Sequence, residues 1–263
     1  MFMSSAAENV SGSVVSLWRY PVKSMMGEPI EAAEVTQRGL WGDRTYALLD
    51  CGTGKVVSAK NPRKWPNLFR FRAVCTGDPL HAGTMPAVEV TLPDGRTLHS
   101  GQHDANQVLS AALGRAVTLE STAPPEPALE EYWPDIAELA QRDSVTDETM
   151  LAGTFFDAAT VHLLTTATLK ALGHSYPAGC FDACRFRPNI VVDAGPSQDG
   201  FVENAWVDHT VTIGDQVQLH IARPCPRCVM TTLPQGTLQQ DTGILRTAVR
   251  QNQGHVGVYA RVL

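Results

Sequence analysis

The chain has 263 residues, of which 43% are hydrophobic and 18% charged. This composition supports a sizeable core and excludes disorder over most of the chain. Its 21 Lys and Arg residues against 27 Asp and Glu residues give a net charge of −6, which argues against a nucleic-acid polymer bound by bulk charge. No apolar run approaches the roughly 18 residues of a membrane span, and no signal peptide is recognisable at the start. We expect a cytoplasmic protein without a membrane partner.

Short strands dominate the prediction for the first half of the chain. Residues 1–13 are expected to be flexible, and alternating β-prone residues predict a strand over 14–20. Two hairpins are predicted, over 46–57 around Cys51-Gly52-Thr53-Gly54 and over 88–99 around Pro93-Asp94-Gly95. Helical spacing over 104–113 ends at Gly114. Residues 14–120 are therefore predicted to form a mostly β domain.

The composition changes between residues 121 and 150, where prolines and acidic residues cluster. We predict a linker there, with a short helix after Pro134. Residues 151–263 follow as a second domain, with strands over 161–164, 189–192, 211–213, 217–221 and 256–262 and helices over 165–172 and 244–251. Many short strands with few helices predict a β-rich α+β fold of barrel-like form.

The densest chemical signal is the segment Pro224-Cys225-Pro226-Arg227-Cys228. Cationic neighbours lower the pKa of a cysteine thiol and favour its thiolate. The spacing leaves three hypotheses open. Four cysteines could bind zinc, one could be a functional thiolate on a soft metal, or all could be incidental. The zinc hypothesis adds Cys180 and Cys184 to the two cysteines of this segment.

A second signal is a set of cations at the ends of predicted strands: Lys23, Arg44, Arg185 and Arg187. Cations that converge from strand ends suit a small phosphorylated or anionic ligand. The alternative is ordinary surface ion pairing with the many carboxylates, and the residues alone favour that alternative.

These segments, in their order along the chain, resemble the MOSC family, to which molybdenum-cofactor sulfurases and amidoxime-reducing components belong. The resemblance begins with Leu17-Trp18-Arg19-Tyr20-Pro21-Val22-Lys23-Ser24 and continues with Gly42-Asp43-Arg44. Arg185-Phe186-Arg187-Pro188-Asn189 and the cysteine segment, followed by Thr231-Thr232, complete it. It implies a MOSC β-barrel core with an N-terminal β-barrel domain, from about residue 14 to the end.

The resemblance also implies a molybdenum cofactor, a metal-binding pyranopterin with a terminal phosphate. Cys228 matches the cysteine that binds the metal and acts in catalysis, while Cys225 is implied to be a small buried neighbour or a redox bystander. Further residues match positions that contact the cofactor: Lys23, Ser24, Arg44, Asp157, Thr165, Arg185, Arg187 and Asn189. The loop Leu233–Asp241 departs from the pattern of the mitochondrial enzymes, so their substrate preference does not transfer.

The implied activity is the reduction of N-hydroxylated compounds, such as hydroxylamines, amidoximes and N-hydroxy base analogues. The sequence contains no flavin, haem or iron–sulfur motif, so a separate electron-transfer protein of ferredoxin, flavodoxin or cytochrome type is expected. The alternative function is a cofactor or sulfur carrier that uses Cys228 as a ligand or as a persulfide. A zinc-stabilised β protein that only binds partners is a third hypothesis.

Overall fold

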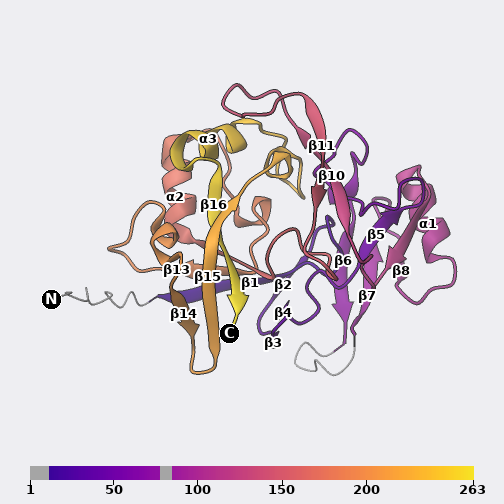
Figure 1. The fold of residues 1–263 in the computed structure, drawn as a ribbon, viewed down its shortest axis with the longest axis horizontal. Coiled ribbons are helices and arrows are strands. Elements are labelled where there is room, and N and C mark those ends of the chain that lie inside the picture. The colour runs from indigo at the N-terminus through magenta and orange to yellow at the C-terminus, as the bar shows by residue number, and fades with distance from the viewer. Residues whose placement is uncertain (1–11, 78–84) are drawn as a thin grey trace.

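A computed structural model describes residues 12–77 and 85–263. The chain is β-rich with three α-helices in this part (Figure 1). The helices are α1 (Ala105–Leu113), α2 (Thr166–Ser175) and α3 (Gly243–Asn252). The first eight strands are β1 (Ser13–Arg19), β2 (Glu28–Ile30), β3 (Val35–Thr36), β4 (Gly39–Leu40), β5 (Ala47–Asp50), β6 (Arg72–Thr76), β7 (Ala87–Thr91) and β8 (Thr97–His99). The remaining strands are β9 (Val117–Glu120), β10 (Ala128–Trp133), β11 (Ser144–Thr149), β12 (Val161–Thr165), β13 (Ile190–Asp193), β14 (Thr210–Ile213), β15 (Val217–Pro226) and β16 (His255–Val262).

A seven-stranded sheet in the order β14-β15-β16-β12-β13-β1-β2 forms one side of the molecule. Strand β1 pairs antiparallel with β13, with Leu17 opposite Ile190, and β12 runs parallel to β13. The sheet therefore combines two strands from the start of the chain with five from its second half. Its ladder begins at β14 and ends at β2, so the described strands form an open sheet, and the predicted closed barrel is not seen.

The two faces of this sheet bury separate clusters because successive side chains of a strand point to opposite faces. Leu163 of β12 packs on one face with Ile190, Ile221 and Val258. Leu164 packs on the other with apolar side chains of α2 and α3, namely Leu172, Ile244 and Ala248. Figure 1 shows both helices at one end of the sheet. This packing fixes the end of β12 and the loops beside it.

The other side of the molecule contains β5 to β11 and α1 (Figure 1). Strand β5 pairs with β9, and β6, β7 and β8 form a separate sheet. The largest apolar cluster lies here and includes Phe71, Val90 and Leu109. Met230, from the chain after β15, belongs to the same cluster, and Cys228 packs against it. The predicted thiol ligand therefore lies where the two sides of the molecule meet.

Several predicted elements differ from the observed ones. The short helix predicted after Pro134 is not observed. Residues 121–150 contain β10 and β11, which pair over their full length with Ala128 opposite Thr149. Residues 55–57 run antiparallel to β5 as the predicted hairpin requires, with Val57 N donating to Leu48 O at 2.8 Å, but they form isolated bridges at Val56 and not a continuous strand. Helix α2 runs through Gly173 to Ser175.

Other elements match the prediction more closely. The strand over 14–20 and the hairpin over 88–99 are observed as β1, β7 and β8, and α1 ends at Gly114 in the left-handed region. Strand β15 is longer than predicted and includes Cys225. Of the segment expected to be flexible, residues 1–11 lie outside the described part, while Ser13 already belongs to β1. None of the helices in residues 12–77 and 85–263 has the length and apolarity needed to cross a bilayer.

Candidate functional site

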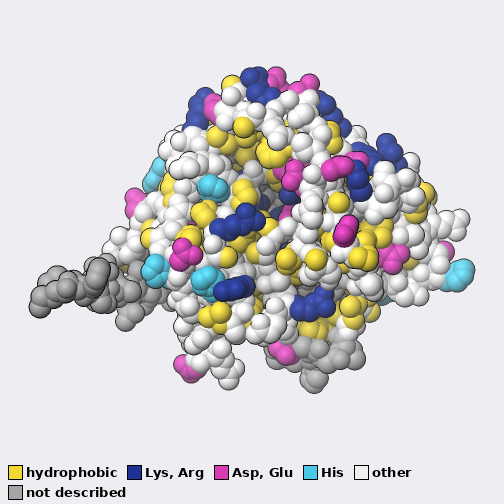
Figure 2. Space-filling model, in the orientation of Figure 1, with side chains coloured by type: hydrophobic (Ala, Val, Ile, Leu, Met, Phe, Trp, Pro, Cys, Tyr) yellow, Lys and Arg dark blue, Asp and Glu magenta, His cyan; other side chains and the backbone are white. Residues whose placement is uncertain are grey.

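An open cavity with about 700 Å³ of empty space, its mouth included, lies between the two sides of the molecule. Figure 2 shows a hollow near the centre of this face, with Lys and Arg side chains inside it. Five cations line the cavity against one carboxylate, that of Asp157. The cations are Lys23, Arg44, Lys60, Arg187 and Arg227. In a chain of net charge −6, this concentration of positive charge creates a local site for an anion.

Three residues of the cavity wall adopt an unusual backbone conformation. Ser24, Arg44 and Arg187 have φ angles of 63°, 47° and 55°, in the left-handed region that side chains other than glycine seldom occupy. Backbone hydrogen bonds hold these loops, including Arg44 N to Tyr20 O at 2.9 Å and Arg187 N to Ala183 O at 3.2 Å. Strain of this kind persists where the surrounding structure imposes it, and it concentrates at ligand sites.

Arg44 and Arg187 both contact one buried aromatic ring. Their guanidinium carbons lie 4.5 Å and 4.1 Å from the centroid of Tyr20, and Arg187 also donates to the Met25 carbonyl at 2.7 Å. Burial lowers the pKa of Arg187 to about 10, and the charge of Arg44 adds to this effect. The pair therefore holds two like charges close together at the cavity wall, an arrangement that an anionic ligand would relieve.

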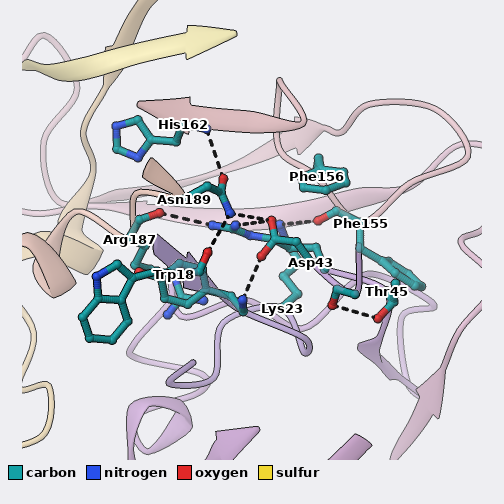
Figure 3. A network of polar contacts seen from close by, with 12 residues as sticks. Trp18, Lys23, Asp43, Thr45, Phe155, Phe156, His162, Arg187 and Asn189 are labelled. Carbon is teal, nitrogen blue, oxygen red and sulfur yellow. Dashed lines mark hydrogen bonds and ion pairs between the residues drawn. The ribbon is translucent and has the colours of Figure 1, made fainter. Parts of the chain in front are cut away.

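Asp43 and Asn189 belong to a hydrogen-bond network beside the cavity (Figure 3). Asp43 pairs with Arg44 and accepts hydrogen bonds from Tyr20 N at 2.7 Å and from Asn189 Nδ2 at 2.9 Å. The amide oxygen of Asn189 accepts from His162 N at 3.1 Å. Asn189 thereby joins the end of β1, the loop before β5 and the start of β12.

Two lysines of the cavity pair with carboxylates. Asp157 pairs with Lys23 and lies 3.3 Å from Lys60 Nζ, which also pairs with Glu131 at 3.0 Å. Lys23 donates to the Phe155 carbonyl at 3.0 Å as well. The pKa of Asp157 lies well below its usual range, because the two ammonium groups outweigh the effect of burial. Burial lowers the pKa of Lys23 in spite of Asp157.

The two cysteines at the end of β15 occupy different environments. Cys228 lines the cavity, and burial, reinforced by the charge of Glu131, raises the pKa of its thiol to about 11. Cys225 is fully buried behind the wall, and Arg227 Nη1 lies 2.8 Å from its sulfur. Burial alone would raise the pKa of Cys225, but the charges of Arg227 and His162 lower it to about 6.

The structure brings together most of the residues that the sequence singled out. The cavity is lined by Lys23, Ser24, Arg44, Asp157, Arg187, Asn189 and Cys228. Two predicted cofactor contacts do not line it. Thr165 is buried at the start of α2, where its hydroxyl donates to Glu203 at 2.6 Å and accepts from Thr168 N. Arg185 is buried and donates to carbonyl groups of a neighbouring loop: Thr231, Leu233 and Gln239.

The four-cysteine zinc hypothesis is wrong. Within the described residues, no three His, Cys, Asp or Glu side chains are grouped closely enough to hold a metal ion. Cys180 is exposed, whereas Cys225 is buried. The Cys228 thiol therefore lies among the cations of the cavity wall and not in a cluster of four cysteines.

Comparison with known proteins adds a family to this geometry. A model of the MOSC N-terminal beta barrel domain matches residues 11–123, and a model of the MOSC domain matches residues 151–263. The chain belongs to the MOSC family. This finding confirms the resemblance inferred from the motifs.

Among curated MOSC relatives, human mitochondrial amidoxime-reducing component 1 is 28% identical over 254 residues, covering 89% of this chain and 68% of the relative. Human mitochondrial amidoxime reducing component 2 is 25% identical over 254 residues, covering 89% and 69%. The mouse component 1 is 28% identical over 257 residues, covering 89% and 67%. The similarity extends over both sides of the cavity.

Sequence reasoning missed several residues of the cavity wall: Lys60, His162, Arg227 and Tyr259. Lys60 lies in a loop with no recognised motif, and only its pairing with Glu131 on β10 places it at the site. Arg227 was visible between the two cysteines but was considered only for its charge. His162 and Tyr259 lie in strands, and a strand position alone does not reveal which cavity a side chain borders.

The residues of the wall fit the cofactor that this family implies. A soft thiol lies at one part of the wall, and five cations offer donors to an anionic group. Arg227 Nε is buried without a hydrogen-bond acceptor among the described residues. Buried donors are almost always satisfied, so a ligand with an acceptor atom suits this wall.

Proposed function

We propose that this MOSC protein is a molybdenum-cofactor-dependent oxidoreductase that reduces N-hydroxylated compounds. The observation that carries the proposal is that the Cys228 thiol and five cations line the same cavity. The membership in the MOSC family and the similarity to amidoxime-reducing components support the choice of cofactor and reaction.

Cys228 would bind the metal, because a thiolate is a preferred ligand for a soft or sulfur-bound metal centre and coordination removes its proton. Ser24, Arg44 and Arg187 would hold the terminal phosphate, since their backbones already point these side chains at one cavity. Asp43, itself held by Asn189, orients Arg44, and the Met25 carbonyl orients Arg187. Lys23, paired with Asp157, supplies a further positive charge in the cavity.

When bound, the molybdenum cofactor supplies the two-electron chemistry that cleaves the N–O bond. For a hydroxylamine, the reaction consumes two electrons and two protons and yields an amine and water. We propose that an external electron-transfer protein of ferredoxin, flavodoxin or cytochrome type delivers the electrons. Lys60, Asp157 and His162 are groups of the cavity wall that can hold or pass a proton.

The proposal is tested by metal and pterin analysis of the full chain, purified from a host that makes the cofactor. We expect about one molybdenum per chain, together with reduction of benzamidoxime by a chemically reduced dye. Cys228→Ala should lose both metal and activity. Cys51→Ala is the matched control, because Cys51 is exposed and does not line the cavity.

The outcomes separate the hypotheses. Bound cofactor without reduction of any N-hydroxylated compound would favour the alternative, a carrier that presents cofactor or sulfur on Cys228. Zinc without pterin, or full activity in Cys228→Ala, would refute the molybdenum proposal.

A further inference from the structure

Cys225 has a role that the family resemblance does not give it. It lies in β15 beside an irregularity of the pairing with β16, between Pro224 and Pro226, and its side chain is fully buried. Arg227 lies two residues later and lines the cavity next to Cys228. The side chain of residue 225 is therefore buried in the protein, whereas the side chains of residues 227 and 228 line the cavity.

Three contacts fix Arg227. Its Nη1 donates to Cys225 Sγ at 2.8 Å, its Nη2 donates to Phe186 O at 2.9 Å, and its backbone N–H donates to Gly254 O at 2.8 Å. Both terminal nitrogens of the guanidinium therefore have partners inside the protein. The remaining donor, Nε, is buried and has no acceptor among the described residues.

This arrangement has an asymmetric energetic consequence. A buried guanidinium that loses its partner incurs a large desolvation penalty, and a buried donor left without an acceptor incurs a smaller one. The sulfur of Cys225 is a partner for the guanidinium and offsets the first penalty. The Nε–H has no acceptor among the described residues, so the second penalty remains. A ligand that brings an acceptor atom to Nε would remove this second penalty.

We propose that Cys225 is a positioning residue whose sulfur, together with the Phe186 carbonyl, fixes the Arg227 guanidinium at the cavity wall so that its Nε–H meets an acceptor oxygen or nitrogen of the bound ligand. The identity of that ligand as the pterin cofactor rests on the proposed function. The contact between Cys225 and Arg227 is independent of the proposed function.

The charge state of the sulfur supports this geometry. Arg227 lowers the pKa of Cys225, and His162 on β12 and Tyr259 on β16 add to the effect through charge and hydrogen bonding. These groups face Cys225 from the neighbouring strands, and Lys60 and Cys228 lie on the cavity side. A thiolate paired with a guanidinium is a charge-assisted contact, stronger than one to a neutral thiol.

The first experiment titrates thiolate absorbance of the cofactor-free full chain in the ultraviolet. We expect a step of one thiolate near pH 6, well below the ordinary cysteine value of about 8.5. Cys225→Ser should remove this step, and Arg227→Gln should move it above about pH 8.5. Absence of any step below pH 8 in the unmodified chain would overturn the proposal, and this result requires no variant to fold.

The second experiment measures pterin and molybdenum per chain in Cys225→Asp and Cys225→Ala. The Cys225→Asp variant restores a negatively charged partner for Arg227, so it should contain several-fold more pterin and molybdenum per chain than the Cys225→Ala variant. A bystander position would give the opposite order, because a buried carboxylate is costlier than a methyl group. Equal or better loading in Cys225→Ala would therefore refute the positioning role.

Failure of this inference can be told apart from failure of the proposed function. A chain that shows the thiolate step near pH 6 but purifies without pterin keeps the Cys225–Arg227 pair and loses the molybdenum proposal. A chain that carries the cofactor but shows no such step keeps the proposed function and loses the positioning role of Cys225.

Discussion

Replacing Asp157 by Asn tests whether the cations of the cavity wall depend on this carboxylate. Asp157 pairs with both Lys23 and Lys60. Lys60 keeps Glu131 as a second carboxylate at 3.0 Å, whereas for Lys23 the described residues offer only the Phe155 carbonyl in addition. The substitution preserves the size of the side chain and removes the charge, so its main effect is a buried Lys23 ammonium without a counter-charge.

The expected cost follows from burial. The side chain of Lys23 is 7% exposed and that of Asp157 is 31% exposed. Breaking a fully buried pair by removing one partner costs about 3–5 kcal/mol, and the partial exposure of Asp157 reduces this to about 2–3 kcal/mol. Lys23 would respond with a further decrease in its pKa, which burial already lowers.

The assay is urea unfolding of the cofactor-free chain at several pH values, with Asp147→Asn as the control. Asp147 pairs with Lys55 at 2.6 Å, but its side chain is 64% exposed, so its loss should cost under about 1 kcal/mol. Because the pKa of Asp157 is depressed in the folded state, its contribution is present above its unfolded value of about 3.9 and declines as the pH falls below it. Equal costs for the two variants at neutral pH would refute the reasoning.

Three further substitutions test the structural roles assigned above. Thr165→Val should lower the free energy of unfolding by about 2–3 kcal/mol, because it removes a helix cap and a partner of buried Glu203. The molybdenum content per folded chain should be unchanged. A lower molybdenum content would instead show that Thr165 contacts the cofactor. Arg185→Met should leave three loop carbonyls between residues 231 and 239 without donors and lower the free energy of unfolding by about 3 kcal/mol. The change should be measurable as a lower Tm and as faster hydrogen exchange in this loop. Gly257→Ala should cost about 2–4 kcal/mol in urea unfolding, since φ is +78° and the new Cβ would lie 2.4 Å from His162 Nε2; wild-type stability would contradict this.

The parts of the fold that the sequence predicted are those governed by local signals. The hairpin of β7 and β8 follows from its Pro-Asp-Gly turn, and α1 ends at Gly114 because glycine accepts the left-handed conformation there. The end of α2 was predicted too early because a glycine is a typical signal for the end of a helix. The helix continues past Gly173 for two more residues to Ser175, just before Pro177.

Pairings between distant segments were out of reach. The acidic, proline-rich composition of residues 121–150 suggested a linker, yet Val56 bridges to Leu129 and a full ladder joins β10 to β11. Short strands such as β2 and β4 exist only because of their partners, and their two or three residues carry no periodic signal. The same limitation hid Lys60, whose place at the site depends on Glu131 of β10.

Most of the site residues singled out from the sequence line the cavity, because they lie in motifs with a chemical meaning. Arg185 and Thr165 show where that reasoning fails. Both lie in or beside motif segments that contact the site, and both act one layer away from it, Arg185 on loop carbonyls and Thr165 on Glu203. A motif indicates which segment matters, whereas side-chain direction is decided by the turn. Within Arg185-Phe186-Arg187, the first arginine points into the protein and the third residue, at φ 55°, points into the cavity.

The placement of β1 explains how one cavity can draw on both ends of the chain. β1 belongs by sequence to the N-terminal half, yet it pairs with β13 in the sheet of the second half. The residues that follow β1, Lys23 and Ser24, are therefore held by the same sheet that positions Arg187 and Asn189 after η2 (Ala183–Arg185). Relative motion of the two sides would have to break this ladder or the bonds of Asp43 to Asn189 and Tyr20 N. The positions of the cavity cations relative to the Cys228 thiol are thus set by backbone pairing, which is the rigidity that the proposed binding of one ligand at both ends would need.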